Sequence, residues 1–148
     1  MRIIFAADHA GYELKNTLLA FVDSLGYDTK DCGAHQLHED DDYPEIIRTA
    51  VTTMRSEDRA IILGGSGQGE AMVANKIPGI RAAVWYGGNK DIIVRSREHN
   101  DANVLSIGAR FVTVEEAKDA VQTWLTTEFS GEVRHVRRIH KIDRPLMD

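Results

Sequence analysis

The sequence predicts an α/β fold of three layers, helix, sheet and helix, in a Rossmann-like arrangement with a five-stranded parallel sheet and an extra C-terminal helix. Two observations support this prediction. Short apolar segments alternate along the chain with segments of helical period. Polar or glycine-rich stretches follow several apolar segments, as expected where ligands bind at the carboxyl ends of parallel strands.

The first part of the chain supplies a strand, a helix and a second strand. Arg2–Ala7 is rich in Ile and Phe and is the first expected strand. Tyr12–Leu25 carries its apolar residues on one helical face, and Gly26 ends that helix. Tyr27–Asp31 is a weaker strand, because few of its residues are apolar.

An acidic loop, Gly33–Asp42, precedes the next helix. Pro44 fits the first turn of that helix, and apolar residues from Ile46 to Met54 form its buried face. Arg59–Leu63 is the third expected strand, and Glu70–Lys76 can form a helix after a glycine-rich loop.

The last two strands are expected at Arg81–Trp85 and Val104–Ile107. Between them we expect a helix over Lys90–Arg97 and a polar connection over Glu98–Asn103.

Two helices complete the chain. Thr113 and Glu116 have capping-box spacing, which predicts a helix start, and Glu132–Asp143 is the last expected helix.

The composition is that of one soluble globular domain over residues 1–148, with 43% hydrophobic and 28% charged residues. No apolar run reaches membrane-spanning length, and the segment from Met1 to Phe5 lacks a signal-peptide pattern. The only cysteine, Cys32, cannot form an internal disulfide, so a reducing cytoplasm is expected. A net charge of −5 argues against nucleic acid as a partner.

The glycine-rich loop Gly64–Gly69 is the strongest indication of a binding site. Backbone N–H groups in such a loop can bind an anion, which could be a phosphate, a carboxylate or an enolate. The spacing fits neither a P-loop, nor a dinucleotide fingerprint, nor a nucleophile elbow. Glu70 follows directly, where it is either a base beside an oxyanion site or an acidic residue that favours the helix dipole.

Other polar residues are expected at the same edge of the sheet. Asp8 and His9 follow the first strand, either as a helix cap with an exposed histidine or as part of a site. Arg110 follows the fifth strand. His99, taken alone, is ordinary polar surface. Metal binding is not expected, because the histidine spacing is unsuitable apart from the improbable pair His35 and His38.

The C-terminal segment gathers positive charge. Arg134, Arg137, Arg138 and Lys141 fall on one face of the last expected helix. This face is either solvated and paired with acidic neighbours or a phosphate clamp, and it could reach a second subunit.

Six stretches in order together resemble the type B ribose-5-phosphate isomerases, a family that also holds the galactose-6-phosphate isomerase subunits. They are Asp8–Gly11 (DHAG), Asp42–Pro44 (DYP), Gly64–Glu70 (GGSGQGE), Ala74–Lys76 (ANK), Arg97–Asn100 (REHN) and Arg134–Arg138 (RHVRR). The resemblance implies a three-layer α/β/α fold and an isomerase that interconverts ribose 5-phosphate and ribulose 5-phosphate in the pentose phosphate pathway. It also implies no metal or other cofactor, and a homodimer, sometimes a tetramer, with sites at the dimer interface.

The resemblance also implies residue roles. One branch of the family has a cysteine base at the position of Ser66, and this sequence resembles the other branch, which has serine there and a glutamate at Glu70. Four residues are then catalytic: Glu70, Ser66, His99 and Asp8. Nine are then substrate-binding: His9, Tyr43, Gly65, Gly67, Gly69, Asn100, Arg110, Arg134 and Arg138.

Two alternatives stay open at this point. One is an isomerase of a six-carbon sugar phosphate, such as galactose 6-phosphate or allose 6-phosphate. The other is a non-catalytic flavodoxin-like domain whose loop holds a nucleotide or flavin phosphate. A receiver-type signalling domain is weaker, because it needs an aspartate where Gly64 and Gly65 stand.

Overall fold

A single parallel sheet organises the chain. The computed structural model describes residues 1–145, so residues 146–148 of the expected domain lie outside the described part. The strands follow the order β2-β1-β3-β5-β4. Their bounds are β1 Arg2–Ala7, β2 Asp28–Asp31, β3 Arg59–Gly64, β4 Ala82–Trp85 and β5 Val104–Gly108. The predicted five-stranded parallel sheet is confirmed.

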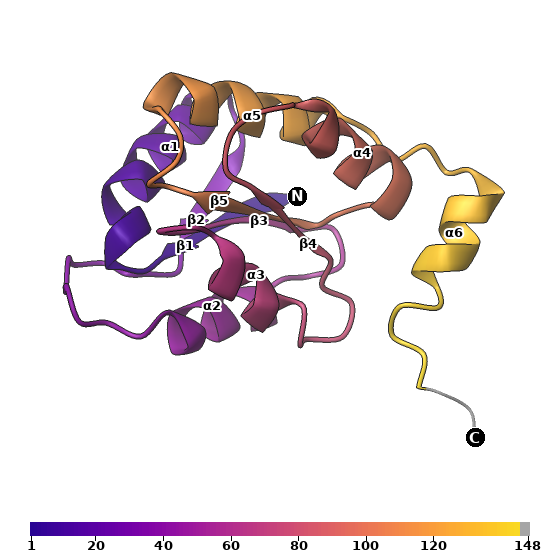
Figure 1. Cartoon of the computed structure of the whole chain (residues 1–148), viewed down its shortest axis with the longest axis horizontal. Helices are drawn as coiled ribbons and strands as arrows, with labels where there is room; N and C mark the ends of the chain where they lie inside the picture. Colours follow the sequence, from indigo (N-terminus) through magenta and orange to yellow (C-terminus); the bar gives the residue numbers. More distant parts are fainter. Residues whose placement is uncertain (146–148) are drawn as a thin grey trace.

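Helices cover both faces of the sheet, which confirms the three predicted layers (Figure 1). On one face lie α1 (Tyr12–Ser24), α4 (Asp91–Asn100) and α5 (Val114–Thr126). On the other lie α2 (Tyr43–Thr52) and α3 (Gln68–Ala74), whereas α6 (Val133–Ile139) stands beyond the β4 edge next to α4. Among the described residues, none of these helices combines the length and the apolar character needed to cross a bilayer.

The alternation of side chains along β1 explains the two apolar cores. Ile3 and Phe5 pack in the cluster that includes the fully buried Trp124 of α5. Ile4 and Ala6 point the other way, into the cluster formed with α2 and α3. A strand buried on both faces needs apolar residues at every position, which is why β1 reads as a continuous apolar run.

The structure corrects two predicted boundaries. The segment from Glu98 to Asn100 belongs to α4 and is not a connection. Asp101, with φ of 45°, ends that helix, and its carboxylate accepts a hydrogen bond of 2.8 Å from Arg97. Glu98, His99 and Asn100 are polar because they lie on the less buried side of the last helical turn, and not because they form a loop. The last helix is also shorter than predicted, because it ends at Ile139 and continues as turns.

Candidate active site

Three loops meet at the carboxyl edge of the sheet, as the parallel topology requires. The loops after β3 and β5 are joined directly, because the N–H of Ala109 donates to the carbonyl of Gly64 at 2.8 Å and that of Arg110 donates to Gly65 at 3.1 Å. The loop after β1, which begins at Asp8, follows the neighbouring strand. The sheet therefore brings together chain segments that are far apart in the sequence.

Glu70 is buried at the centre of this edge, with only 4% of its surface exposed. Its carboxylate packs against the backbone of Gly64: a Cβ atom at that glycine would lie 1.9 Å from Oε1. Burial raises the pKa of the Glu70 carboxyl, its own backbone N–H opposes the rise, and the negative charge of Asp8 adds to it. The residue is thus a carboxyl group held in a poorly solvated position, which makes it more basic than an exposed glutamate and suits it to act as a general base.

The glycine-rich loop contains a residue in the left-handed conformation that favours glycine. Gly67 has φ of 76° and precedes α3, and its carbonyl accepts a hydrogen bond of 2.6 Å from the buried hydroxyl of Ser106. Within residues 1–145, the N–H groups of Gly65, Ser66 and Gly67 find no acceptor. These donors lie in the loop that leads to Glu70, so they are available to an oxyanion.

Two side chains predicted to bind substrate border the same loop. The Tyr43 phenol lies against Gly69, where an added Cβ would approach the hydroxyl oxygen to 2.5 Å. The Arg110 guanidinium lies against Gly65, where the corresponding distance is 3.2 Å. One aromatic and one cationic group therefore line the loop, a combination suited to a phosphorylated sugar.

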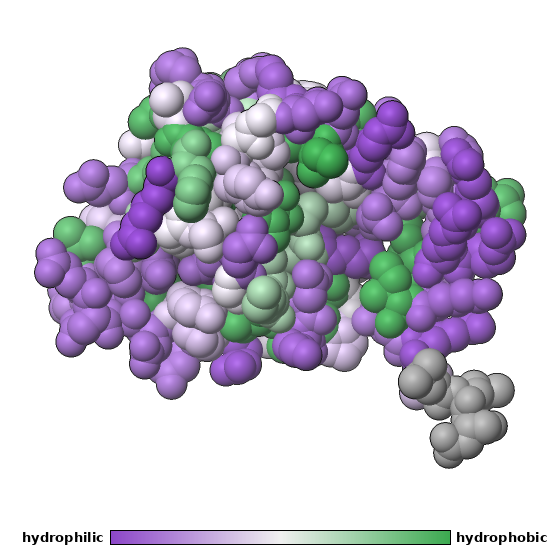
Figure 2. Space-filling model, in the orientation of Figure 1, coloured by the Kyte–Doolittle hydropathy of each residue, from purple (hydrophilic) through white to green (hydrophobic). Residues whose placement is uncertain are grey.

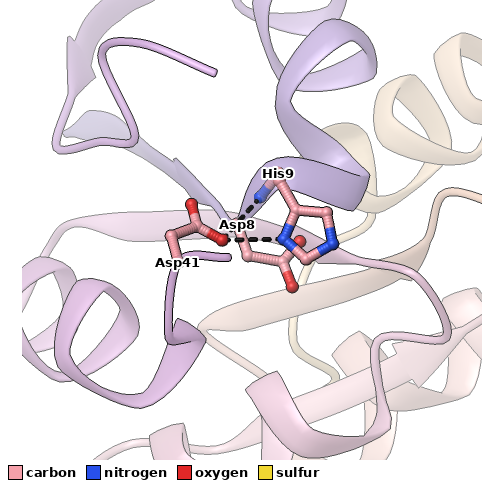
Figure 3. Close-up of side chains that lie close together, drawn as sticks. All are labelled: Asp8, His9 and Asp41. Atoms are coloured by element: carbon pink, nitrogen blue, oxygen red, sulfur yellow. Dashed lines mark hydrogen bonds and ion pairs between the residues drawn. The ribbon is translucent and has the colours of Figure 1, made fainter. Parts of the chain in front are cut away.

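Asp8 and His9 form a tight turn at the end of β1 (Figure 3). The buried carboxylate of Asp8 accepts hydrogen bonds from the N–H groups of Ala10 at 2.9 Å and Gly11 at 3.3 Å, so it caps the turn. Since Asp8 also lies close enough to raise the pKa of Glu70, the cap and the site are compatible interpretations.

Asp41 is a member of this site that the sequence analysis did not identify. Its carboxylate binds the Nδ1 atom of His9 at 2.8 Å and the N–H of His9 at 3.1 Å (Figure 3). The hydrogen bond from Asp41 is the main cause that raises the pKa of the His9 imidazole. The acidic run Asp40–Asp42 was the available signal, but nothing in it indicated which carboxylate would reach His9.

Asp8, His9 and Asp41 also form the one group among residues 1–145 with ligand atoms close enough to hold a metal ion, all within 4.8 Å of one another. The Nδ1 atom of His9 and the Oδ1 atom of Asp41 are already bonded to each other. Two of the three possible ligand atoms are therefore paired with each other, and the expectation of a metal-free site stays a prediction.

The remaining predicted site residues lie near the amino ends of the strands, opposite the end that carries Glu70. The last turn of α4 holds His99 and Asn100, and the carbonyl of Asn100 accepts a hydrogen bond of 2.9 Å from Arg81, just before β4 begins. Arg134 and Arg138 lie on the neighbouring α6. A strand of four to six residues spans roughly 13–20 Å, so one chain does not bring these groups to Glu70.

The junction of α4 and α6 contains a second residue that the sequence analysis did not single out. His135 is buried and stacks on His99, with ring centroids 4.4 Å apart and an angle of 14° between the planes. Burial lowers the pKa of His135, and the neighbouring His99 and Arg134 lower it further. Figure 2 shows that mainly hydrophilic side chains cover α6 around this junction.

Comparisons with known proteins agree on one family. The sequence profile of the family described as Ribose/Galactose Isomerase matches residues 3–142. Ribose-5-phosphate isomerase B of Mycolicibacterium paratuberculosis is 43% identical over 141 residues, which cover 94% of this chain and 87% of that protein. The enzyme of the same name from Mycobacterium tuberculosis is 42% identical over 141 residues, which cover 94% of this chain and 86% of that protein.

Solved structures give the same result. The ribose-5-phosphate isomerase B of Clostridium thermocellum superposes with a TM-score of 0.89 at 43% identity, covering 96% of this chain and 95% of the other. The enzyme of Mycoplasma genitalium, solved with bound ribulose 5-phosphate, superposes with a TM-score of 0.89 at 33% identity, covering 95% and 93%.

Proposed function

The chain belongs to the ribose/galactose isomerase family, and we propose that it interconverts ribose 5-phosphate and ribulose 5-phosphate with Glu70 as the base. The observation that carries this proposal is the buried Glu70 carboxylate next to a loop with unused N–H donors. An aldose–ketose isomerisation needs a base for the C2 proton and donors for the oxyanion that forms, and this edge supplies both.

The proposed reaction begins with opening of the sugar ring. His99 of a second subunit moves the ring proton, with Asp8 nearby. Glu70 then removes the proton from C2 and returns it to C1, so the intermediate is a cis-enediolate. The N–H groups of Gly65, Gly67 and Gly69 and the hydroxyl of Ser66 stabilise its oxygen, and losing one such donor costs about 3 kcal/mol of barrier.

The phosphate is held by positive and polar groups from both subunits in this proposal. His9 and Arg110 come from the chain that supplies Glu70, whereas Asn100, Arg134 and Arg138 come from the second. Tyr43 lines the sugar, since its phenol borders the loop at Gly69. Enclosing the intermediate between two subunits would also exclude water, which protects an enediol phosphate from losing its phosphate.

Two features support a homodimer with shared sites. Within each chain, the residues assigned to one reaction lie at opposite ends of the strands, Glu70 at the carboxyl ends and Asn100 near the amino ends. The β4 edge strand is only partly covered, and a hollow of about 300 Å³ beside it is lined by residues that include Ala82, Asn100 and Ile142. A second copy packed against β4 would cover this outer strand. It would also bring its own α6 toward the carboxyl ends of the first chain's strands.

The cytoplasm is the compartment that we propose for this isomerase. The single cysteine, Cys32, has no intrachain partner and suits a reducing environment.

A direct ultraviolet assay of ribose 5-phosphate conversion, run with a chelator, tests the proposal. The wild-type protein should be active, and Glu70→Gln should lose activity on the order of 10³-fold while still binding the sugar phosphate. Near-normal turnover by Glu70→Gln would refute the assigned role. A wild-type protein that converts only galactose 6-phosphate or allose 6-phosphate would move the assignment to a six-carbon substrate.

A further inference from the structure

The contact between His9 and Asp41 has a chemical consequence for phosphate binding. One carboxylate oxygen, Oδ1 of Asp41, binds both the backbone N–H and the Nδ1 atom of His9. The two residues are 32 positions apart and come from the turn after β1 and the loop before α2. Two contacts to one oxygen fix both the position of the histidine backbone and the plane of its ring.

The ring orientation leaves one nitrogen free for a ligand. In Figure 3, Nδ1 faces Asp41 and the other ring nitrogen, Nε2, points away from it. The His9 side chain keeps 30% of its surface exposed, whereas that of Asp41 keeps 13%. Asp41 is therefore the inner member of the pair, and His9 is the member that can meet a ligand.

The hydrogen bond at Nδ1 decides what Nε2 can do. In a neutral imidazole only one ring nitrogen carries a proton, and the carboxylate of Asp41 draws that proton to Nδ1. Nε2 would then be an acceptor and would repel a phosphate oxygen. His9 can donate to a phosphate through Nε2 only when both nitrogens are protonated, which is the form that a neighbouring carboxylate stabilises.

We propose that Asp41 is a positioning residue that holds His9 as an imidazolium with its Nε2–H directed at the substrate phosphate. This inference rests on the proposed function, in which His9 contacts that phosphate. The second oxygen of Asp41, Oδ2, is buried and has no hydrogen-bond partner among the described residues, so His9 supplies the main compensation for the charge of Asp41.

The surrounding charges agree with this role. Asp41 raises the pKa of His9 most, desolvation opposes the rise, Asp8 adds to it, and Arg110 opposes it. A histidine with a raised pKa is charged below that pKa and loses its charge as the pH rises through it. Phosphate affinity should therefore fall with rising pH as His9 deprotonates, and that loss should begin at lower pH once Asp41 is neutralised.

The variant Asp41→Asn tests this proposal, with Asp40→Asn as the matched control. Both changes remove one negative charge from the same loop, but Asp40 is exposed, and among the described residues it makes no hydrogen bond or ion pair with His9. At a pH between the titration midpoints of His9 in wild type and in the variant, Asp41→Asn should raise the KM for ribose 5-phosphate roughly three- to tenfold with kcat within about twofold, as expected when a charged hydrogen-bond partner becomes neutral. Asp40→Asn should leave both constants near wild type.

A double-variant measurement separates positioning from a general effect on the fold. In a His9→Gln background, Asp41→Asn should cause no further rise in KM, because its effect passes through His9. A further rise of the same size would overturn the proposal, as would equal KM values for Asp41→Asn and Asp40→Asn.

A titration of the His9 ring by NMR keeps the test independent of turnover. The apparent pKa of His9 should be lower in Asp41→Asn than in both wild type and Asp40→Asn, and added inorganic phosphate should raise it in the wild type. An unchanged His9 titration in Asp41→Asn would overturn the positioning role. A wild-type protein inactive on ribose 5-phosphate would overturn the proposed function instead, and the NMR titration with inorganic phosphate would then decide the role of Asp41.

Discussion

His99 and His135 lie ring against ring, 4.4 Å between centroids, at the contact of α4 and α6. The helix α4 runs back from the carboxyl ends of the strands and ends beside the start of β4. His99, in its last turn, therefore lies near the amino ends of the strands, away from Glu70, and the stack on His135 holds its ring there. A reaction that uses both Glu70 and His99 therefore needs two chains.

Mixing two inactive variants tests this requirement. Glu70→Gln and His99→Asn should each be nearly inactive as homodimers. After unfolding and refolding together, half of the dimers should be mixed, and each mixed dimer has one site with both residues intact, so about one quarter of wild-type activity should return. No recovery, with mixed dimers shown by mass spectrometry, would mean that each chain completes its own site.

The acid limb of the pH profile should report Glu70. A base must be ionised, and burial raises the pKa of Glu70, so kcat should fall as the pH falls through a midpoint above the ordinary glutamate value of about 4.3. Asp8→Asn removes a negative neighbour and should move this midpoint to lower pH. If Asp8→Asn does not shift the midpoint of the acid limb of kcat, the result would argue against Glu70 as the titrating group.

Gly64→Ala should displace the base without unfolding the protein. The new methyl group would overlap the Glu70 carboxylate, which lies at the end of a movable side chain. A misplacement of about 1 Å can cost on the order of 10²-fold in kcat, while the midpoint of thermal unfolding should shift little. Gly65→Ala is the comparison, since its methyl group would press on Arg110 and should affect KM more than kcat.

Asp58 should contribute to stability in a pH-dependent way. Burial acts to raise its pKa, but hydrogen bonds from the Arg2 side chain and from the N–H groups of Arg55 and Arg2 outweigh burial and hold the pKa well below its usual range. This stabilisation is present above the unfolded-state pKa of about 3.9 and is lost as the pH falls further.

Urea unfolding of Asp58→Asn checks this expectation. At pH 7 the variant should lose about 2–3 kcal/mol, whereas Glu57→Gln, an exposed neighbour, should lose little. The difference between wild type and Asp58→Asn should shrink in acid, and a difference independent of pH would contradict the assigned ionisation.

The sequence alone determined the elements whose signals are local. The continuous apolar run of β1, the capping box of Thr113 and Glu116, and the glycine-rich loop before Glu70 each depend on residues close together in the chain, and the structure contains all three. The order of the strands in the sheet depends on contacts between distant segments, so local signals did not predict it. The alternation of strands and helices was enough to predict that the strands are parallel.

Tertiary structure decided the contacts between distant segments. Asp41 reaches His9 across 32 positions, and nothing local distinguishes it from Asp40 or Asp42. His135 is buried only because α6 packs on α4, and His99 ends up away from Glu70 because α4 runs antiparallel to the strands. Hydrophobic periodicity fixes which face of a helix is buried, whereas the chain path through the sheet fixes which polar side chains meet.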